Sequence, residues 1–334
     1  MTLAAERIAR AACDLAAALR RPVQPDDRLA LAVSGGPDSM AMLALLATAF
    51  PGQVIAATVD HGLRPEGAAE AAMVAAYCAT QDVPHAVLTL ATAIGPANIQ
   101  AAARDARYLA LRGWATGAGA TLLATAHHAD DQAETFLMRA ARGSGLSGLA
   151  AIRPAQRVGA DPERGLMLVR PFLGWRRADL RRVAETWSLP FVDDPSNANA
   201  RFDRTRFRTL LREAPWLDAG QIALSAGYLA EADHDLRALE QWLWVSRALP
   251  GDAETLRIDV TALPREVRRR LARIAIAKAR AEMGISAPKW SPATNIEALL
   301  DALDAGKSAT QGGVLASAKG GIWQFRVAPP RRTH

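Results

Sequence analysis

Two glycines stand between two apolar runs near the start of this chain, and this order strongly limits the local fold. Leu29–Val33 is a short apolar run typical of a buried strand, and Met40–Leu46 has the composition of a helix. A strand that turns through glycines into a helix directs main-chain amide groups and the positive helix end toward one point, which binds anions. The intervening residues are Ser34, Gly35, Gly36, Pro37, Asp38 and Ser39.

Asp38 is unusual in an anion site, because a carboxylate beside a phosphate is unfavourable unless a cation lies between them. Its presence predicts a Mg²⁺ ion that bridges Asp38 and phosphate oxygens. The segment contains neither a Walker P-loop nor a G-x-G-x-x-G pattern. An ordinary Gly/Pro/Ser turn is the alternative, but the strand–turn–helix context favours nucleotide binding.

Apolar β-like runs alternate with helical runs up to about residue 190, which predicts a doubly wound α/β domain with a mainly parallel sheet. We expect a long loop over Gly143–Gly165. We expect residues 1–215 to form this domain, and 216–330 a smaller, mainly helical domain with a possible small sheet. The predicted strands are Leu29–Val33, Val54–Val59, Ala86–Leu90, Thr121–Ala124 and Leu166–Val169, with small-sheet strands at Leu256–Val260, Gly313–Ala316 and Gly321–Val327; the predicted helices are Met40–Ala49, Glu66–Thr80, Ala97–Thr116, Asp130–Ala141, Ala178–Trp187, Ile222–Ala248, Pro264–Met283 and Pro292–Ala305.

The composition is that of an ordinary globular protein with a basic balance. The chain has 334 residues, a formal net charge of +6 and a pI of about 9.9, which favours a polyanionic partner. Cys13 and Cys78 are its only cysteines and form no metal-ligand pattern. No apolar stretch reaches the length of a membrane span, so we expect a cytoplasmic protein without a membrane partner. The oligomeric state is left open, a homodimer included.

Polar residues follow two more of the predicted elements. His61, after the second strand, is a candidate for the adenine or ribose pocket, although an exposed loop histidine is the simpler interpretation from spacing alone. Arg104, Arg107 and Tyr108 lie three or four residues apart on a predicted helix and share one face. A solvated charged face is the ordinary interpretation of such a group.

Asp130, Asp131 and Glu134 converge at the start of a predicted helix. As a functional group, they predict a pocket for a cationic substrate beside ATP. The alternative is a capping box formed by Asp131 and Glu134. The adjacent His127 and His128 do not face the same way on a regular element, which disfavours a zinc site.

Four arginines and two phenylalanines fall within residues 201–208. Arg204 and Arg208 lie one helical turn apart, as do Arg201 and Thr205. Basic residues with interleaved aromatics suit phosphate contacts and base stacking on RNA, and a solvated helix face is the alternative. Further arginines at 176–182 and 265–273 could extend a basic track.

Together, these motifs closely resemble those of the tRNA(Ile)-lysidine synthetase family, within the PP-loop ATP pyrophosphatases. The resemblance covers residue 29 to about residue 215 densely, from SGGPDS through H-x-D-D-Q-A-E-T at 128–135 to the arginine cluster. It implies a PP-loop fold and a ligase that joins lysine to C2 of the wobble cytidine of tRNA(Ile) with a CAU anticodon. ATP is split to AMP and pyrophosphate through an adenylated cytidine.

The resemblance also implies residue roles. Residues 34–39 would hold the pyrophosphate, with Mg²⁺ on Asp38. Arg104 and Arg107 would offset phosphate charge during adenylation. Asp130, Asp131 and Glu134 would hold free lysine. Residues 1–215 would be the PP-loop ATP-binding catalytic domain, and residues 216–330 a tRNA-binding domain. The tRNA contacts would include Arg201, Arg204, Thr205 and Arg208.

Two departures from the family pattern and two rival functions accompany this resemblance. Thr205 stands where the family usually has Asn, which puts one contact in doubt, and longer members carry a further C-terminal domain, so tRNA recognition is expected to shift onto the remaining domains. A PP-loop tRNA thiolase would need cysteines near the site, and Cys13 and Cys78 do not fall beside the loop. A non-catalytic ATP- or RNA-binding module is the other rival.

Overall fold

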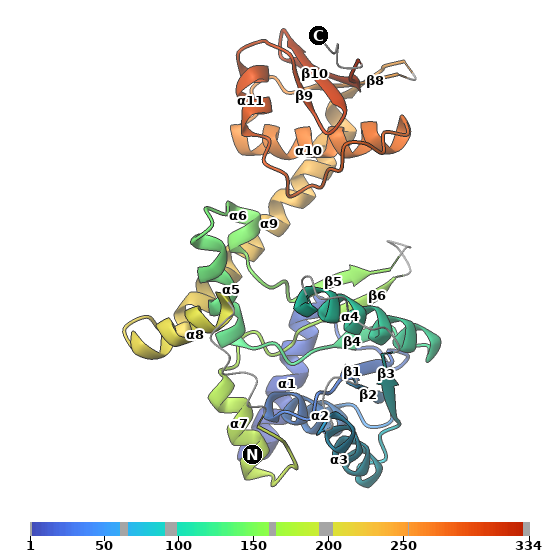
Figure 1. Cartoon of the computed structure of the whole chain (residues 1–334), viewed down its shortest axis with the longest axis vertical. Helices are drawn as coiled ribbons and strands as arrows, with labels where there is room; N and C mark the ends of the chain where they lie inside the picture. Colours follow the sequence, from blue (N-terminus) through green and yellow to red (C-terminus); the bar gives the residue numbers. More distant parts are fainter. Residues whose placement is uncertain are drawn as a thin grey trace. The chain divides into compact units, whose positions relative to one another are not determined.

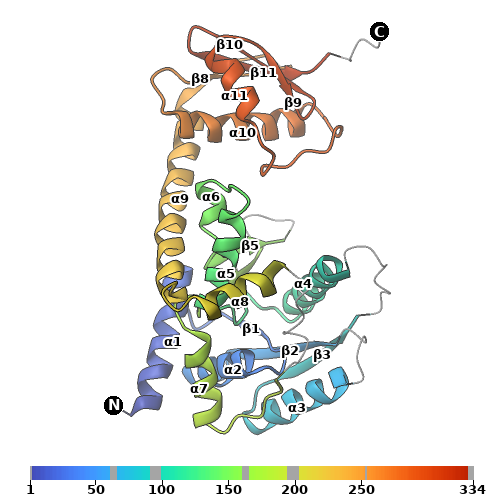
Figure 2. The ribbon, with the colours of Figure 1, turned by 60° about the vertical axis from the view of Figure 1, so that its left-hand side comes forward.

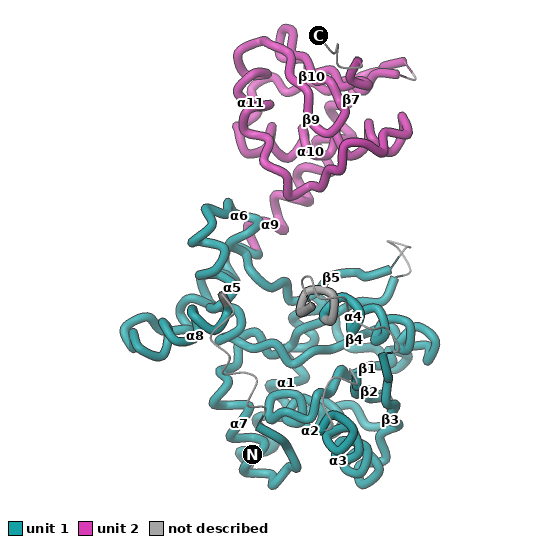
Figure 3. Tube along the Cα trace, viewed as in Figure 1, with its two compact units in different colours: residues 1–230 teal, residues 231–334 magenta. Residues whose placement is uncertain are grey.

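The computed structural model describes residues 2–60, 66–90, 99–159, 165–193, 203–252 and 254–329, without the side chains of 99–103 and 203. His61 and Arg201, both predicted site residues, lie outside this range. Contacts divide the chain into two compact units, residues 1–230 and 231–334 (Figure 3). The predicted domain boundary at residue 215 falls earlier, between two helices. Within the described residues, no helix has the length and apolarity needed to cross a membrane.

The first unit is built on a six-stranded sheet with the order β3-β2-β1-β4-β6-β5. The first five strands in this order are parallel, and β5 pairs with β6 antiparallel at the edge. The parallel strands therefore end at one edge of the sheet, where ligands bind in such folds. The strands are β1 (Leu29–Ala32), β2 (Val54–Asp60), β3 (His85–Thr89), β4 (Leu122–Ala124), β5 (Ala155–Val158) and β6 (Leu166–Val169).

Helices cover both faces of this sheet (Figures 1 and 2). Leu29 and Leu31 of β1 pack into one core with α1, α2, α3 and α7, whereas Ala30 packs into a second core with α4. Alternate residues of one strand thus face opposite layers, and the predicted doubly wound fold is confirmed. The helices are α1 (Leu3–Leu19), α2 (Pro37–Ala49), α3 (Glu66–Thr80), α4 (Ile99–Gly117), α5 (Ala129–Ala140), α6 (Leu146–Leu149), α7 (Arg177–Thr186) and α8 (Asp203–Glu213).

The prediction of a long loop over Gly143–Gly165 is wrong in part, because α6 and β5 lie within it. Side chains from α5 hold this segment in place. The Gln132 amide donates to the Ile152 carbonyl and accepts from the Ile152 amide, and Arg139 donates to two carbonyls around α6. Both elements are only four residues long, too short for a periodic apolar pattern.

The second unit contains a five-stranded antiparallel sheet with the order β7-β8-β11-β10-β9. Three of its strands match the predicted small sheet, and β7 and β9 extend it. Leu271 and Ile276 of α10 pack against Trp323 and Phe325 of β11 in its core. The elements are α9 (Ala219–Arg247, which crosses the division between units), β7 (Ala248–Leu249), β8 (Thr255–Asp259), α10 (Arg265–Glu282), α11 (Glu297–Asp304), β9 (Ala309–Gln311), β10 (Val314–Lys319) and β11 (Ile322–Val327).

Candidate active site

The segment between β1 and α2 forms a compact turn closed by its own serines. The Ser34 amide donates to Ser39 Oγ at 3.1 Å, and Ser39 Oγ donates to the Gly36 carbonyl at 3.0 Å. Gly35 has a φ of +82°, and a Cβ there would lie 3.3 Å from the Met73 side chain. The left-handed conformation therefore favours glycine at this position, and a side chain there would also require the Met73 side chain to shift slightly.

The N-terminus of α2 presents free amide groups at this turn. Gly36 is the N-cap residue and makes no side-chain capping bond, and Pro37 begins the helix. Proline suits this position because the missing amide would have no intrahelical partner. The remaining amides and the helix dipole favour a negatively charged ligand here. This geometry agrees with the predicted pyrophosphate cradle, whose role stays a prediction.

Asp38 lies in the first turn of α2, and its two carboxylate oxygens differ. Oδ2 lies 3.5 Å from His128 Nε2 and 3.9 Å from Arg177 Nε. Oδ1 is buried and has no hydrogen-bond partner among the described residues. An unpartnered buried carboxylate oxygen carries a desolvation cost, and a hard cation would offset it. Mg²⁺, which takes oxygen ligands and commonly uses one or two carboxylates plus substrate phosphates, fits this atom.

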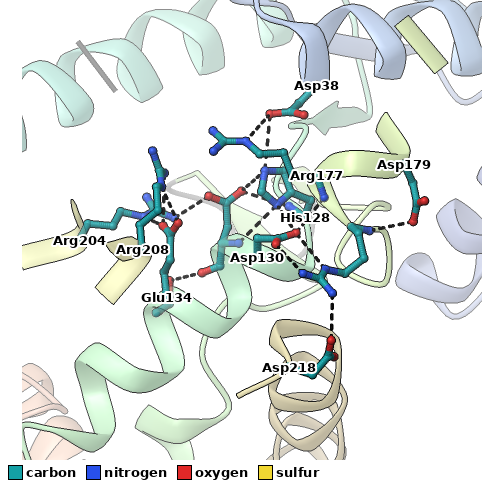
Figure 4. Close-up of polar contacts among 12 residues, drawn as sticks. Asp38, His128, Asp130, Glu134, Arg177, Asp179, Arg204, Arg208 and Asp218 are labelled. Carbon is teal, nitrogen blue, oxygen red and sulfur yellow. Dashed lines mark hydrogen bonds and ion pairs between the residues drawn. The ribbon is translucent and has the colours of Figure 1, made fainter. Parts of the chain in front are cut away.

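His128 connects Asp38 to the acidic residues of α5 (Figure 4). It is 3% exposed, and its ring nitrogens lie 3.5 Å from Asp38, 3.6 Å from Asp130 and 3.5 Å from Asp131. Burial, the largest single influence, lowers the pKa of His128, but these three carboxylates together outweigh it and raise that pKa. The structure therefore gathers three predicted site residues around one histidine.

His128 is also the N-cap residue of α5. The Asp131 amide donates to His128 Nδ1 at 3.3 Å, and the His128 amide donates to Asp131 Oδ2 at 3.1 Å. The capping box thus joins His128 to Asp131, and the alternative that paired Asp131 with Glu134 is wrong. Burial would raise the pKa of Asp131, but the charges of His128 and Arg204 lower it to about 2. Asp131 is ionised at neutral pH.

Asp130 is held by the start of α7. The Arg176 guanidinium donates to both carboxylate oxygens, at 3.3 and 3.0 Å, and the Arg177 amide donates to Oδ2 at 2.8 Å. Burial would raise the pKa of Asp130, but these bonds lower it. Arg176 also pairs with Asp218 at 3.2 Å. Two arginines that the sequence suggested for a basic track thus point toward the acidic site.

Arg204 and Arg208 lie against the acidic face of α5 (Figure 4). Arg204 donates to Glu134 Oε2 at 2.8 Å and to Asp131 Oδ1 at 2.9 Å, and Arg208 donates to Glu134 Oε1 at 2.8 Å. Glu134 is 2% exposed, so one buried carboxylate is shared by two arginines. The residues predicted to contact tRNA therefore meet the residues predicted to hold lysine, and both roles stay predictions.

Arg104 and Arg107 share one face of α4, as predicted from their spacing. Their guanidiniums lie 5.1 and 5.8 Å from the ring centroid of Tyr108. Burial lowers the pKa of Arg107. Burial likewise lowers the pKa of His127 to about 3, and the charges of nearby arginines, Arg104 among them, lower that pKa further. Arg104 thus lies near the end of β4, and its predicted part in adenylation stays a prediction.

Sequence reasoning missed the central position of His128 and the contacts of Arg176 and Arg177. The run of two histidines and two aspartates after β4 signals a polar site, but the helix period cannot show which histidine faces inward. Arg177 is the first residue of α7 and contacts Asp38, which lies far from it in the sequence. Thr205 lies on α8, and its part in tRNA contact stays a prediction.

Comparisons with known proteins converge on one family. A family model described as a PP-loop domain matches residues 6–214. The tRNA(Ile)-lysidine synthase of Zymomonas mobilis is 42% identical over 91% of this chain and 90% of its own length, and that of Novosphingobium aromaticivorans is 40% identical over 93% and 92%. Among solved structures, the U34-tRNA thiolase NcsA of Methanococcus maripaludis has a TM-score of 0.54 and 16% identity, and covers 67% of this chain and 80% of its own. At that identity, the likeness concerns the fold alone.

Proposed function

Because this chain belongs to the tRNA(Ile)-lysidine synthase family, we propose that it joins lysine to C2 of the wobble cytidine of tRNA(Ile) with a CAU anticodon. The reaction consumes ATP and releases AMP and pyrophosphate. The observation that carries the proposal is the meeting of Asp38 with Asp130 and Asp131 around His128 at the edge where the parallel strands end. One site can thereby serve the nucleotide and the amino acid.

The chemistry explains why both substrates are needed in one place. The C2 carbonyl of cytosine is a poor electrophile, and its oxygen is a poor leaving group. Attack of that oxygen on the α-phosphorus of ATP releases pyrophosphate and converts the oxygen to an adenylate. The ε-ammonium of lysine first loses a proton to solvent, and the neutral amine then attacks C2. The C2–N bond forms, AMP leaves with the oxygen, and the attached nitrogen releases a second proton to solvent.

ATP is the substrate expected of a PP-loop enzyme, and we assign the phosphate site to residues 34–39. The free amides at the start of α2 suit pyrophosphate. Mg²⁺ would be held by Asp38 through its unpartnered Oδ1 and would neutralise developing phosphate charge. Arg104 and Arg107 would supply further positive charge to the adenylation step.

We assign free lysine to the carboxylates of α5. At neutral pH, lysine carries two ammonium groups and one carboxylate, and the site offers both signs of charge in Asp131, Glu134, Arg204 and Arg208. An ammonium group that replaces a guanidinium on Glu134 frees that guanidinium for the lysine carboxylate, so no charge is left unpaired. The low pKa of Asp131, about 2, makes it an ion-pair partner rather than a base.

A tRNA thiolase is not favoured by the two cysteines of this chain. Cys78 is buried in the core beside Val74, and burial raises its pKa to about 11, so its thiol is protonated at neutral pH. Cys13 is exposed on α1. Neither supplies the thiolate pair that a persulfide carrier or iron–sulfur ligation would use. A cytoplasmic location and a homodimer stay predictions.

The direct test incubates the protein with a tRNA(Ile) transcript, ATP and labelled lysine, followed by nucleoside analysis. We expect label in a modified cytidine, with AMP and pyrophosphate released in step. A tRNA(Ile) transcript with uridine at the wobble position is the matched control and should receive no label. AMP release without label transfer would contradict the lysine assignment, and the absence of both would leave only a binding module.

A further inference from the structure

The helix α8 presents two different faces. Arg204 and Arg208 lie one turn apart and meet the carboxylates of α5. Arg206, Phe207 and Leu210 lie on another side of the helix, as its period requires, and line a different surface. Arg206 is exposed. Among the arginines of α8, Arg204 and Arg208 are therefore committed to the acidic site, whereas Arg206 faces elsewhere.

This second surface is a pocket of about 440 Å³ where α8 packs along α5. Its volume lies within the range of about 300–1,000 Å³ typical of small-ligand sites. From the end of α5 come Met138 and Ala141, followed by Arg142, which is exposed. Leu210 is 44% exposed, so the apolar part of the pocket is open to solvent.

The lining combines an aromatic ring and aliphatic side chains with two exposed guanidiniums. A flat heteroaromatic base suits Phe207 and the neighbouring aliphatic side chains, and a phosphate suits Arg142 and Arg206. A purely apolar peptide or lipid tail carries no anionic group, and so it does not match the exposed arginines of this lining. A nucleotide offers the base and the phosphate together, so the chemistry of the pocket matches one unit of a single-stranded RNA.

We propose that this pocket binds an unstacked nucleotide of the tRNA anticodon loop, close in sequence to the cytidine that is modified. This inference rests on the proposed function, which places that cytidine beside the acidic residues of α5 that Arg204 and Arg208 of α8 contact. An α-helix with side chains is about 10–12 Å across, so a strand that reaches both faces of α8 needs only a few nucleotides. The pocket fixes the strand, and the acidic site receives the reacting base.

The electrostatic test compares charge reversals on the full-length chain. Arg206→Glu and Arg142→Glu should each weaken binding of an anticodon stem-loop by about tenfold and lower the salt slope by about one. Arg212→Glu is the matched control, because Arg212 lies on the same helix, is 76% exposed in its side chain and lies outside the pocket. An equal loss of stem-loop affinity in all three variants would mean that only the overall charge of the protein matters, and it would contradict the proposed nucleotide pocket.

The stacking test uses stem-loops with 2-aminopurine placed at one loop position at a time. Stacking on an aromatic ring quenches this fluorophore, so one position should be quenched on binding. Phe207→Leu should remove that quenching and weaken binding by about tenfold, whereas Phe207→Tyr should retain both. Unchanged quenching in Phe207→Leu at every position would overturn the stacking role.

Lysidine formation by the unaltered protein is measured in parallel, so the two proposals fail separately. An unaltered protein that binds the stem-loop through Arg206 and Phe207 but transfers no lysine would contradict the proposed function and retain the pocket. If the unaltered protein forms lysidine normally but the pocket variants bind the stem-loop as tightly as Arg212→Glu does, the proposed function stands and the proposed pocket is contradicted. No binding of the stem-loop by the unaltered protein would overturn the pocket as well.

Discussion

Two arginine-rich helices, α8 in the first unit and α10 in the second, look alike in sequence and differ in their partners. Arg204 and Arg208 of α8 share the buried Glu134, next to residues that contact Asp38 through His128. Arg265 and Arg269 of α10 pair with acids of α11, with Arg269 Nε 2.6 Å from Glu297. The first set meets the candidate active site, and the second joins two helices of one small domain.

The difference shows that arginine clusters do not by themselves mark an RNA surface. On α10, Arg270 is 7% exposed and donates to the fully buried Asp233 at 2.6 Å. A buried pair of this kind fixes how α9 and α10 pack. We therefore expect that loss of an α5–α8 pair impairs chemistry and that loss of an α10–α11 pair affects mainly stability. The predictions below test this contrast.

The largest effect is expected from Asp38→Asn, which keeps the shape of the side chain and removes its charge. Release of AMP and pyrophosphate should fall by at least about a hundredfold, because the metal and the phosphates lose their anionic partner. The fold should remain, since Asp38 Oδ1 makes no hydrogen bond with the described residues. Turnover near the unaltered rate in a pyrophosphate-release assay would contradict the metal assignment.

Glu134→Gln is expected to reduce both activity and stability. The substitution leaves two guanidiniums facing a neutral amide at a site that is 2% exposed, which should cost about 2 kcal/mol of unfolding free energy. The KM for lysine should rise by about tenfold or more, with a smaller change in the KM for ATP. Denaturant unfolding and lysine titrations measure the two effects. An unchanged KM for lysine would remove Glu134 from the amino-acid site.

Much of the first unit could be predicted from the sequence, because its strands and helices have strong local signals. The glycine turn follows from its place between two apolar runs, and the parallel strands follow from short apolar runs that alternate with helical ones. The face shared by Arg204 and Arg208 follows from the helical period of 3.6 residues. What that shared face meets could not be predicted. Glu134 lies 70 residues from Arg204, and a helix period carries no information on a partner that distant. The acids that pair with α10 were hidden for the same reason.

The pH dependence of stability should report on His128. Its pKa is raised in the folded state, so its stabilising contribution is fully present below about pH 6.5, its ordinary value, and is lost as the pH rises through the folded value. His128→Asn keeps a side chain suited to the N-cap and removes the charge. Between about pH 6 and pH 9, the unaltered protein should therefore lose more unfolding free energy than the variant. If the unfolding free energies of the two proteins change with pH in parallel, the raised pKa of His128 is contradicted.

The smallest effect is expected from Arg269→Met on α10, the counterpart of Glu134→Gln in the comparison. Arg269 contacts Glu266 and Glu297 near the surface, and exposed pairs contribute about 1 kcal/mol or less. Methionine keeps much of the aliphatic stem, so the loss should be that of the charge. Lysidine formation and stem-loop affinity should match those of the unaltered protein. A clear fall in stem-loop affinity, or in its salt slope, would mean that α10 contacts RNA, and the contrast between the two helices would fail, because arginines that hold a domain together would then also bind the substrate.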